Sequence, residues 1–154
     1  MQNVTNARKS RGFDVWLHVG RTNLKVHRVL NQLLSTLELS LAQHEILMTI
    51  GQHRGLTQRQ LSEKLLVVKS NVSALLKKLE ARGLVSRAPD SKDSRNKRLK
   101  LTAAGERLVE KSFELQNRVV DAMASQLSDD DLKQLDDVMG RVSNALDQLT
   151  ADDN

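Results

Sequence analysis

Apolar residues along the chain recur mainly at steps of three and four, which is the period of an amphipathic α-helix. This pattern predicts a long helix over residues 13–39 and a shorter helix over residues 42–53, followed by Gly55 as a permissive stop residue. Thr57 and Gln60 have the spacing of a capping box, in which a hydroxyl and an amide satisfy backbone groups at a helix start. A third helix of about two to three turns is therefore expected after Thr57.

The next pattern, over residues 69–82, predicts a helix with two unlike faces. On a helical wheel, short polar residues and lysines occupy one side, and the other side is apolar, with Val72, Leu75, Leu76 and Leu79. Gly83 then stands where a glycine commonly ends a helix. One face is expected to join the core and the other to meet solvent or a partner.

A different period follows this helix. Two short alternating runs, over residues 84–87 and 99–101, flank a polar stretch at 89–97, and this pattern is typical of a two-stranded β-hairpin. Thr102 and Ser128 then cap two further helices, and the three aspartates after Ser128 favour the dipole of the last helix. The predicted fold class is mainly α with a small β-hairpin, in the order helix, turn, helix, hairpin that describes a winged helix-turn-helix.

Charge is distributed unevenly along the 154 residues. The formal net charge is +5 and the isoelectric point is near 9.7. Residues 54–100 hold thirteen basic and four acidic residues, whereas residues 128–154 hold two basic and eight acidic ones. A polyanionic partner, if there is one, is therefore expected to bind the middle of the chain.

Several function classes find no support in the sequence. There is no cysteine, so disulfides and thiolate metal sites are excluded. His18 and His27 are nine residues apart, as are His44 and His53, and neither pair has the spacing of a helical metal site. We see no catalytic motif and expect no cofactor, no metal and no enzymatic activity. No apolar run reaches the length of a membrane helix, so we expect a cytoplasmic protein without a membrane partner.

The segment from about Leu56 to Gly105 resembles the MarR family of bacterial and archaeal transcriptional regulators. The resemblance rests on the order and spacing of the stretches 56–61, 69–73, 79–87, 90–95 and 99–105, which read LTQRQL, KSNVS, LEARGLVSR, DSKDSR and LKLTAAG. It implies a winged helix-turn-helix that binds double-stranded DNA as a homodimer.

The candidate DNA contacts lie on the recognition helix and on the hairpin. Short polar side chains at the helix start let the backbone approach base edges, and for this readout we select Ser70, Asn71 and Ser73. Lys77 and Lys78 are expected to meet phosphates one turn later. An ordinary solvated helix face is the alternative, which the basic hairpin after the helix makes less favourable.

The hairpin, or wing, supplies a second set of candidates. Arg95 near the loop tip is expected to enter the minor groove, with Asp93 orienting its guanidinium. The other candidate contacts of the hairpin are Arg87, Lys97 and Arg98. A floppy charged loop without a role in binding is the alternative.

The terminal helices are expected to form the dimer, because the mass between them is too small to cover every apolar stripe within one chain. A purely intramolecular bundle is the alternative. The resemblance places His44 near the crevice in which members of the family bind small aromatic or carboxylate effectors, and Trp16 and Arg21 are the other candidate effector contacts. The alternative for His44 is a packing or surface role, and the alternative for Trp16 is a place in the core. Arg28 is a further cation that could contact an anionic effector.

These observations predict three functional segments and one function. Residues 1–40 form an N-terminal dimerisation helix, residues 41–101 the winged helix-turn-helix, and residues 102–154 the C-terminal dimerisation helices. The predicted function is transcriptional regulation, by repression at a pseudo-palindromic operator. A winged-helix adaptor that binds protein instead of DNA is the first alternative, and an enzyme with an unrecognised site is the second.

Overall fold

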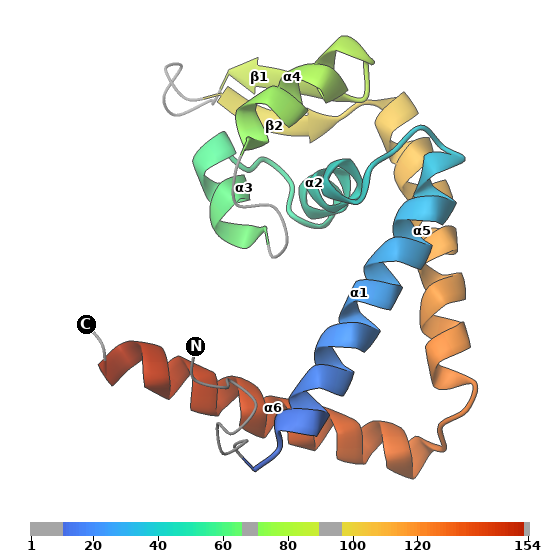
Figure 1. The fold of residues 1–154 in the computed structure, drawn as a ribbon. Coiled ribbons are helices and arrows are strands. Elements are labelled where there is room, and N and C mark those ends of the chain that lie inside the picture. Colours follow the sequence, from blue (N-terminus) through green and yellow to red (C-terminus); the bar gives the residue numbers. More distant parts are fainter. Residues whose placement is uncertain (1–10, 66–70, 90–96, 153–154) are drawn as a thin grey trace, which may run out of the picture. The chain divides into compact units, whose positions relative to one another are not determined.

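The computed structural model describes residues 11–65, 71–89 and 97–152, and side chains up to residue 149 (Figure 1). Its elements are, in chain order, α1 (Phe13–Ser35), α2 (Leu41–Gln52), α3 (Gln58–Lys64), α4 (Val72–Ala81), β1 (Val85–Pro89), β2 (Lys97–Leu101), α5 (Ala103–Ala124) and α6 (Asp129–Asp152). The mainly helical fold with one antiparallel hairpin confirms the fold class predicted from the sequence.

Helix α1 ends at Ser35, one turn before the end that the apolar pattern predicts. Glu38 adopts a left-handed conformation with φ 53, and the N–H of Leu39 donates to the carbonyl of Leu34 at 3.1 Å. This arrangement closes the helix in the manner of a Schellman motif, in which an apolar residue after the cap packs back on the helix. Leu39 is buried, so the apolar period continues past the point where the helix stops.

Capping boxes begin both α2 and α3. Ser40 with Gln43 caps α2, and Thr57 with Gln60 caps α3 as the spacing predicts. Each hydroxyl oxygen accepts a hydrogen bond from a backbone N–H that the helix leaves without a partner. Each glutamine side chain in turn accepts from the backbone N–H of the capping residue. Helix α2 begins and ends one residue earlier than expected, and Gly55 in the following loop has a positive φ of 75.

Helix α4 begins at Val72, later than the sequence predicts, because Asn71 adopts a left-handed conformation with φ 65. Val72, Leu76 and Leu79 are buried as expected. Gly83, with φ 67, ends the helical segment in a conformation that favours glycine.

The hairpin is longer than the pattern predicts at its loop end. Val85 pairs with Leu101 at one end of the hairpin, and Pro89 pairs with Lys97 at the other. The sequence pattern places Pro89 and Lys97 in the loop instead. Pro89 is tolerated because it is the terminal residue of its strand in a two-stranded sheet.

The base of the hairpin is locked to the start of α5. The backbone N–H of Thr102 donates to the carbonyl of Leu84 at 3.0 Å, and its hydroxyl donates to the carbonyl of Gly83 at 2.6 Å. A Cβ atom on Gly105 would lie 2.1 Å from the Leu84 carbonyl oxygen. A glycine is therefore required where α5 passes the strand.

The chain divides into two compact units, residues 1–116 and 117–154, with the boundary inside α5. In the first unit α2 contacts α1, α3, α4 and β2, and Figure 1 shows it nearly end-on below the hairpin. The fully buried side chains of this unit form one aliphatic core around α2, consisting chiefly of Leu34, Ile46, Leu47, Ile50, Leu61, Leu65, Leu76, Leu79 and Leu99.

The second unit consists of the end of α5 and helix α6. Ser128 caps α6, and its N–H and hydroxyl both donate to the carboxylate of Asp131, which holds the pKa of that carboxyl below its ordinary value. None of the helices in the described ranges is both long and apolar enough to cross a membrane. The three functional segments expected from the sequence stay a prediction.

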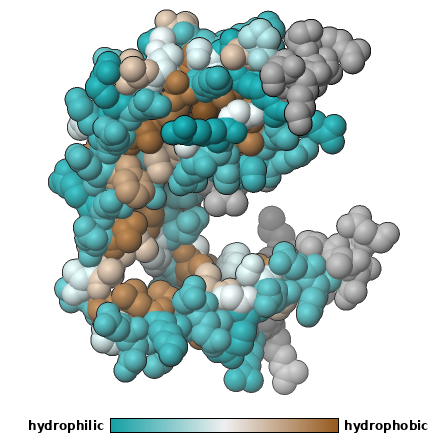
Figure 2. All heavy atoms as spheres, turned by 180° about the vertical axis from the view of Figure 1, so that it is seen from behind, coloured by the Kyte–Doolittle hydropathy of each residue, from teal (hydrophilic) through white to brown (hydrophobic). Residues whose placement is uncertain are grey.

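Apolar side chains remain exposed along the long helices (Figure 2). On α1 these side chains include Phe13, Val15, Trp16, Val19, Leu24 and Val29; on α5 they are Phe113, Val120 and Met123; on α6 they are Leu132, Leu135, Val138, Met139, Val142, Leu146 and Leu149. Soluble monomers rarely present so many exposed apolar side chains.

Candidate nucleic-acid interface

Helix α4 presents a polar, cationic face opposite its buried one. Asn71, Ser73, Lys77 and Lys78 are all exposed. The side chain of Asn71 makes no capping hydrogen bond to the helix that follows it. The structure therefore brings four of the predicted DNA contacts together on one exposed face.

Gln58, the first residue of α3, joins this face to the hairpin. Its Nε2 donates to the hydroxyl of Ser73 on α4, and its Oε1 accepts from Nη1 of Arg87 on β1 at 3.2 Å. Arg87 also forms an ion pair with Glu80 through its Nε. Arg87 is an exposed residue overall, although its side chain itself is only 28% exposed. Its position is therefore set by two side chains before any ligand arrives.

The two predicted cations of β2 lie in different environments. Lys97 is exposed, whereas Arg98 is half-buried, and its Nη1 donates to the Gly55 carbonyl at 2.8 Å and to Oε1 of Gln60 at 3.3 Å. The N–H of Leu99 donates to the carbonyl of Leu56 at 2.8 Å. Arg98 thus helps to fix the strand to the loop between α2 and α3, a role that the sequence did not reveal.

Ser70, Asp93 and Arg95 lie outside the residues that the structure describes. Their assignment to base readout and to the minor groove stays a prediction.

The candidate effector residues are not brought together within one chain. Trp16 is 66% exposed and stacks at a tilt on Phe13, with 5.5 Å between the ring centroids, so the core alternative for Trp16 is wrong within one chain. His44 lies in α2, near the place where Asn31 of α1 accepts the N–H of Leu41. Trp16 and Asn31 are fifteen residues apart on a continuous helix, or about 22 Å along its axis. Trp16 and His44 therefore mark two separate places, and Arg21 is exposed on α1.

His44 is 3% exposed and belongs to the interior of the first unit. Its Nε2 lies 2.7 Å from Oε1 of Gln116, and in this orientation of the amide the ring donates from Nε2. Nδ1 is buried without a hydrogen-bond partner. Burial lowers the pKa of His44 below its ordinary value of 6.5, and the bond to Gln116 and the charge of Glu45 oppose this effect.

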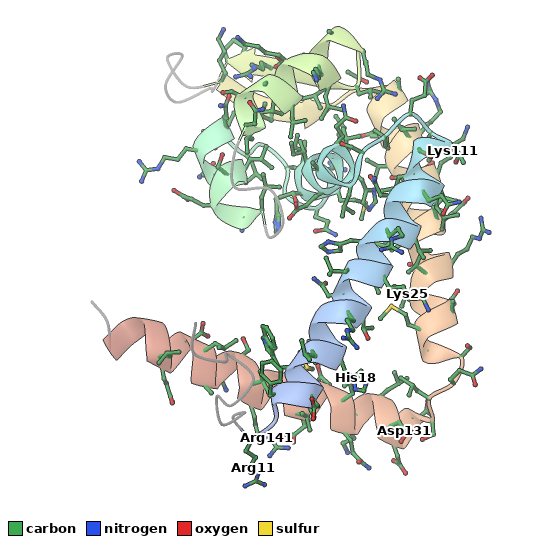
Figure 3. All side chains as sticks on the ribbon, in the orientation of Figure 1. Arg11, His18, Lys25, Lys111, Asp131 and Arg141 are labelled. Atoms are coloured by element: carbon green, nitrogen blue, oxygen red, sulfur yellow. The ribbon has the colours of Figure 1, made fainter. Side chains whose placement is uncertain are left out.

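The described residues contain no group of three or more histidines and carboxylates that could hold a metal ion. Figure 3 shows His18 on α1 between Arg11 and Lys25, each seven residues away along the chain. His18 and Lys25 are about two helical turns apart on α1, whereas Arg11 precedes the helix and Gly12, which has a positive φ.

Sequence reasoning missed Gln58 as a residue that positions the site. It is the first helical residue after the Thr57 cap, and it is half-buried. That position was visible in the sequence, but its partners on α4 and β1 depend on tertiary packing.

Comparisons with known proteins agree with this architecture. The model of the MarR family matches residues 37–96. An HTH-type transcriptional regulator of Bacillus cereus is 31% identical over 102 residues, which are 66% of this chain and 67% of the relative. The organic hydroperoxide resistance transcriptional regulator of Bacillus subtilis is 30% identical over 103 residues, or 67% of this chain and 69% of the relative.

The fold of this chain is also similar to that of a solved protein in complex with DNA. A mutant of MarR from Escherichia coli, crystallised with operator DNA, superposes with a TM-score of 0.71 at 28% identity, covering 86% of this chain and 99% of that one. The superposition agrees with the order of the elements described above. The chain therefore belongs to the MarR family of transcriptional regulators.

Proposed function

We propose that this protein is a non-enzymatic repressor that binds a pseudo-palindromic operator as a homodimer. The observation that carries the proposal is the exposed face of α4, where Asn71 and Ser73 precede Lys77 and Lys78 by about one to two turns. Short polar side chains at the start of a recognition helix suit contact with base edges in the major groove, and lysines further along suit phosphates. The operator complex of the E. coli relative supports the same use of this fold.

The wing is proposed to make the second contact with DNA. Lys97 is exposed on β2, and Arg87 is held in place on β1 by Gln58 and Glu80. We propose that Arg95 continues this basic surface into a narrow minor groove, where the potential is most negative, with Asp93 orienting it. Substituting Arg95 by alanine should then weaken binding to operators with A·T-rich flanks more than to those with G·C-rich flanks.

Dimerisation is proposed to cover the apolar stripes of the long helices. Every large apolar residue of α6 up to Leu149 is exposed within one chain, and six apolar residues of α1 are exposed as well. A second copy of the chain presents the same stripes, and a two-fold partner places two recognition helices at half-sites about 10 bp apart. Deleting residues 132–154 should yield a monomer by sedimentation, and a deletion variant that remains dimeric would contradict this part of the proposal.

A small-molecule effector is proposed to release the protein from its operator. The residues first considered for it, Trp16, Arg21 and His44, do not form one site within a chain, because Trp16 and His44 are far apart along α1 and α2. Exposed Trp16 and Arg21 remain open to a site that two chains build together.

The deciding experiment measures binding to a duplex taken from upstream of the gene that encodes the protein. We expect salt-dependent, sequence-selective binding, with an affinity for this duplex above that for a scrambled duplex of equal composition. Equal affinity for both duplexes at every salt concentration would favour the adaptor, whose basic surface attracts any polyanion.

A further inference from the structure

A cavity of about 500 Å³ lies on the side of α2 that faces β2 and the start of α5. Its volume is within the usual range for small-molecule sites. The wall from α2 includes Met48 and Gly51, and the walls from β2 and α5 include Leu101 and Val109. The side chains of Met48, Leu101 and Val109 provide an apolar surface that suits a ring.

Four charged side chains also line this cavity. Arg54 follows α2 and Lys100 lies on β2, whereas Glu106 and Glu110 stand one turn apart on α5. The structure records no ion pair for any of the four in the residues it describes. Two cations therefore line the cavity, one from the loop after α2 and one from β2, and two carboxylates line it from α5, so the formal charges sum to zero.

We propose that this cavity binds a small amphipathic zwitterion with an aromatic body. A ligand with one charge would meet two attractive and two repulsive groups, whereas a zwitterion can place its anionic group near Arg54 and Lys100 and its cationic group near Glu106 and Glu110. The apolar walls receive the ring, because burial of apolar surface is the main favourable contribution for a ligand of this size. None of the three residues first considered for an effector lines this cavity.

The walls of the cavity are also the segments that attach the wing. Gly55 lines the cavity, and its carbonyl accepts from Arg98. Lys100 and Leu101 are the residues of β2 that follow the bond from Leu99 to Leu56. A ligand here contacts both the loop before α3 and the strand that carries the wing, so its binding changes how these two segments pack. This regulatory step rests on the proposed function, whereas binding to the cavity does not.

The test uses the full chain and three probes that share an indole ring, namely L-tryptophan, tryptamine and indole-3-propionate. In titration calorimetry without DNA, tryptophan should bind about threefold or more tightly than either singly charged probe, since exposed charge pairs are weak. Glu110→Gln should weaken tryptophan and tryptamine but not indole-3-propionate. Lys100→Gln should weaken tryptophan and indole-3-propionate but not tryptamine.

Two further variants complete the design. Val109→Trp fills the cavity and should abolish binding of all three probes, and Glu114→Gln, an exposed position one turn beyond Glu110 and outside the cavity, should change none of them. Absence of binding by all three probes at about 10 mM, or equal binding that neither Glu110→Gln nor Lys100→Gln alters, would overturn the site.

The regulatory step is tested separately with operator DNA. Saturating tryptophan should lower the operator affinity of the wild-type protein by about fivefold or more, and that of Val109→Trp not at all. An operator affinity that tryptophan leaves unchanged in the wild type would overturn the coupling. Failure of the ligand-free protein to bind DNA would instead contradict the proposed function, and the calorimetric result would stand by itself.

Discussion

The side-chain amide of Gln58 donates to the hydroxyl of Ser73, so the first residue of α3 is tied to the exposed face of α4. The same side chain accepts from Arg87 on β1. One glutamine therefore links the recognition helix and the wing, the two parts that are proposed to contact DNA.

Gln58→Ala should reduce the preference for operator over random DNA while changing stability little. The lost hydrogen bonds are exposed, so we expect a loss of about 1 kcal/mol or less in the free energy of unfolding. The operator preference should fall by more, because Ser73 and Arg87 lose a common partner. Glu63→Gln on the same helix, which affects only an exposed pair with Arg59, is the matched control. Unchanged preference in Gln58→Ala would separate this network from recognition.

Lys77 and Asn71 should give different defects, although Lys77 lies on α4 and Asn71 immediately precedes it. Lys77→Ala should weaken binding to all duplexes and lower the slope of log affinity against log salt by about one unit. Asn71→Ala should instead cost roughly 1 to 3 kcal/mol on the operator and much less on random DNA. Isotherms on two duplexes at several salt concentrations provide the measurement. The same defect in both variants on both duplexes would contradict the assignment of roles.

Lys97 and Arg98 are neighbours on β2 with different environments, and this difference predicts a contrast. Arg98→Ala removes the bond to the Gly55 carbonyl and should lower the free energy of unfolding by about 1 to 2 kcal/mol, because the donor is charged but half-buried. Lys97→Ala should leave unfolding unchanged and weaken DNA binding. Chemical denaturation without DNA distinguishes the two variants, and equal stability of both would show that Arg98 does not hold the loop.

Burial of His44 predicts a loss of stability at mildly acid pH. Its pKa in the folded state is below 6.5, the ordinary value that it regains on unfolding, so the unfolded chain binds the proton more readily. The stability associated with neutral His44 is present above about pH 6.5 and is lost as the pH falls towards the folded-state pKa. His44→Gln should therefore show a smaller drop in the free energy of unfolding between pH 7.5 and 5.5. A drop equal to that of the wild type would assign the pH dependence to other groups.

The order of elements could be predicted from the sequence because each carries a local signal. The Thr57 capping box, Gly83 and the alternation around Leu99 all act within a few residues. The predicted end of α1 was wrong by one turn. Leu39 continues the apolar period of the helix, although it lies after the helix cap. Local pattern alone does not distinguish an apolar residue in a helix from one that packs against its end.

The candidate site was predicted in its residue types but not in its internal contacts. Exposure of Lys77 and Lys78 follows from the helical period, whereas the bonds of Arg87 to Gln58 and of Arg98 to Gly55 join residues 29 and 43 positions apart. Such pairs depend on how α3 and the hairpin pack together. The cavity beside α5 was missed for the same reason, since its walls come from three separate elements.

The most direct test of DNA recognition is selection of duplexes from a random-sequence pool by the full-length protein, followed by sequencing. We expect enrichment of a two-fold symmetric sequence with half-sites about 10 bp apart, and loss of that enrichment in a protein with Asn71→Ala and Ser73→Ala together. Such a result would support both the recognition helix and the dimer. Duplexes bound without any enriched sequence, by the wild type as by the double variant, would contradict the proposal that this protein reads an operator.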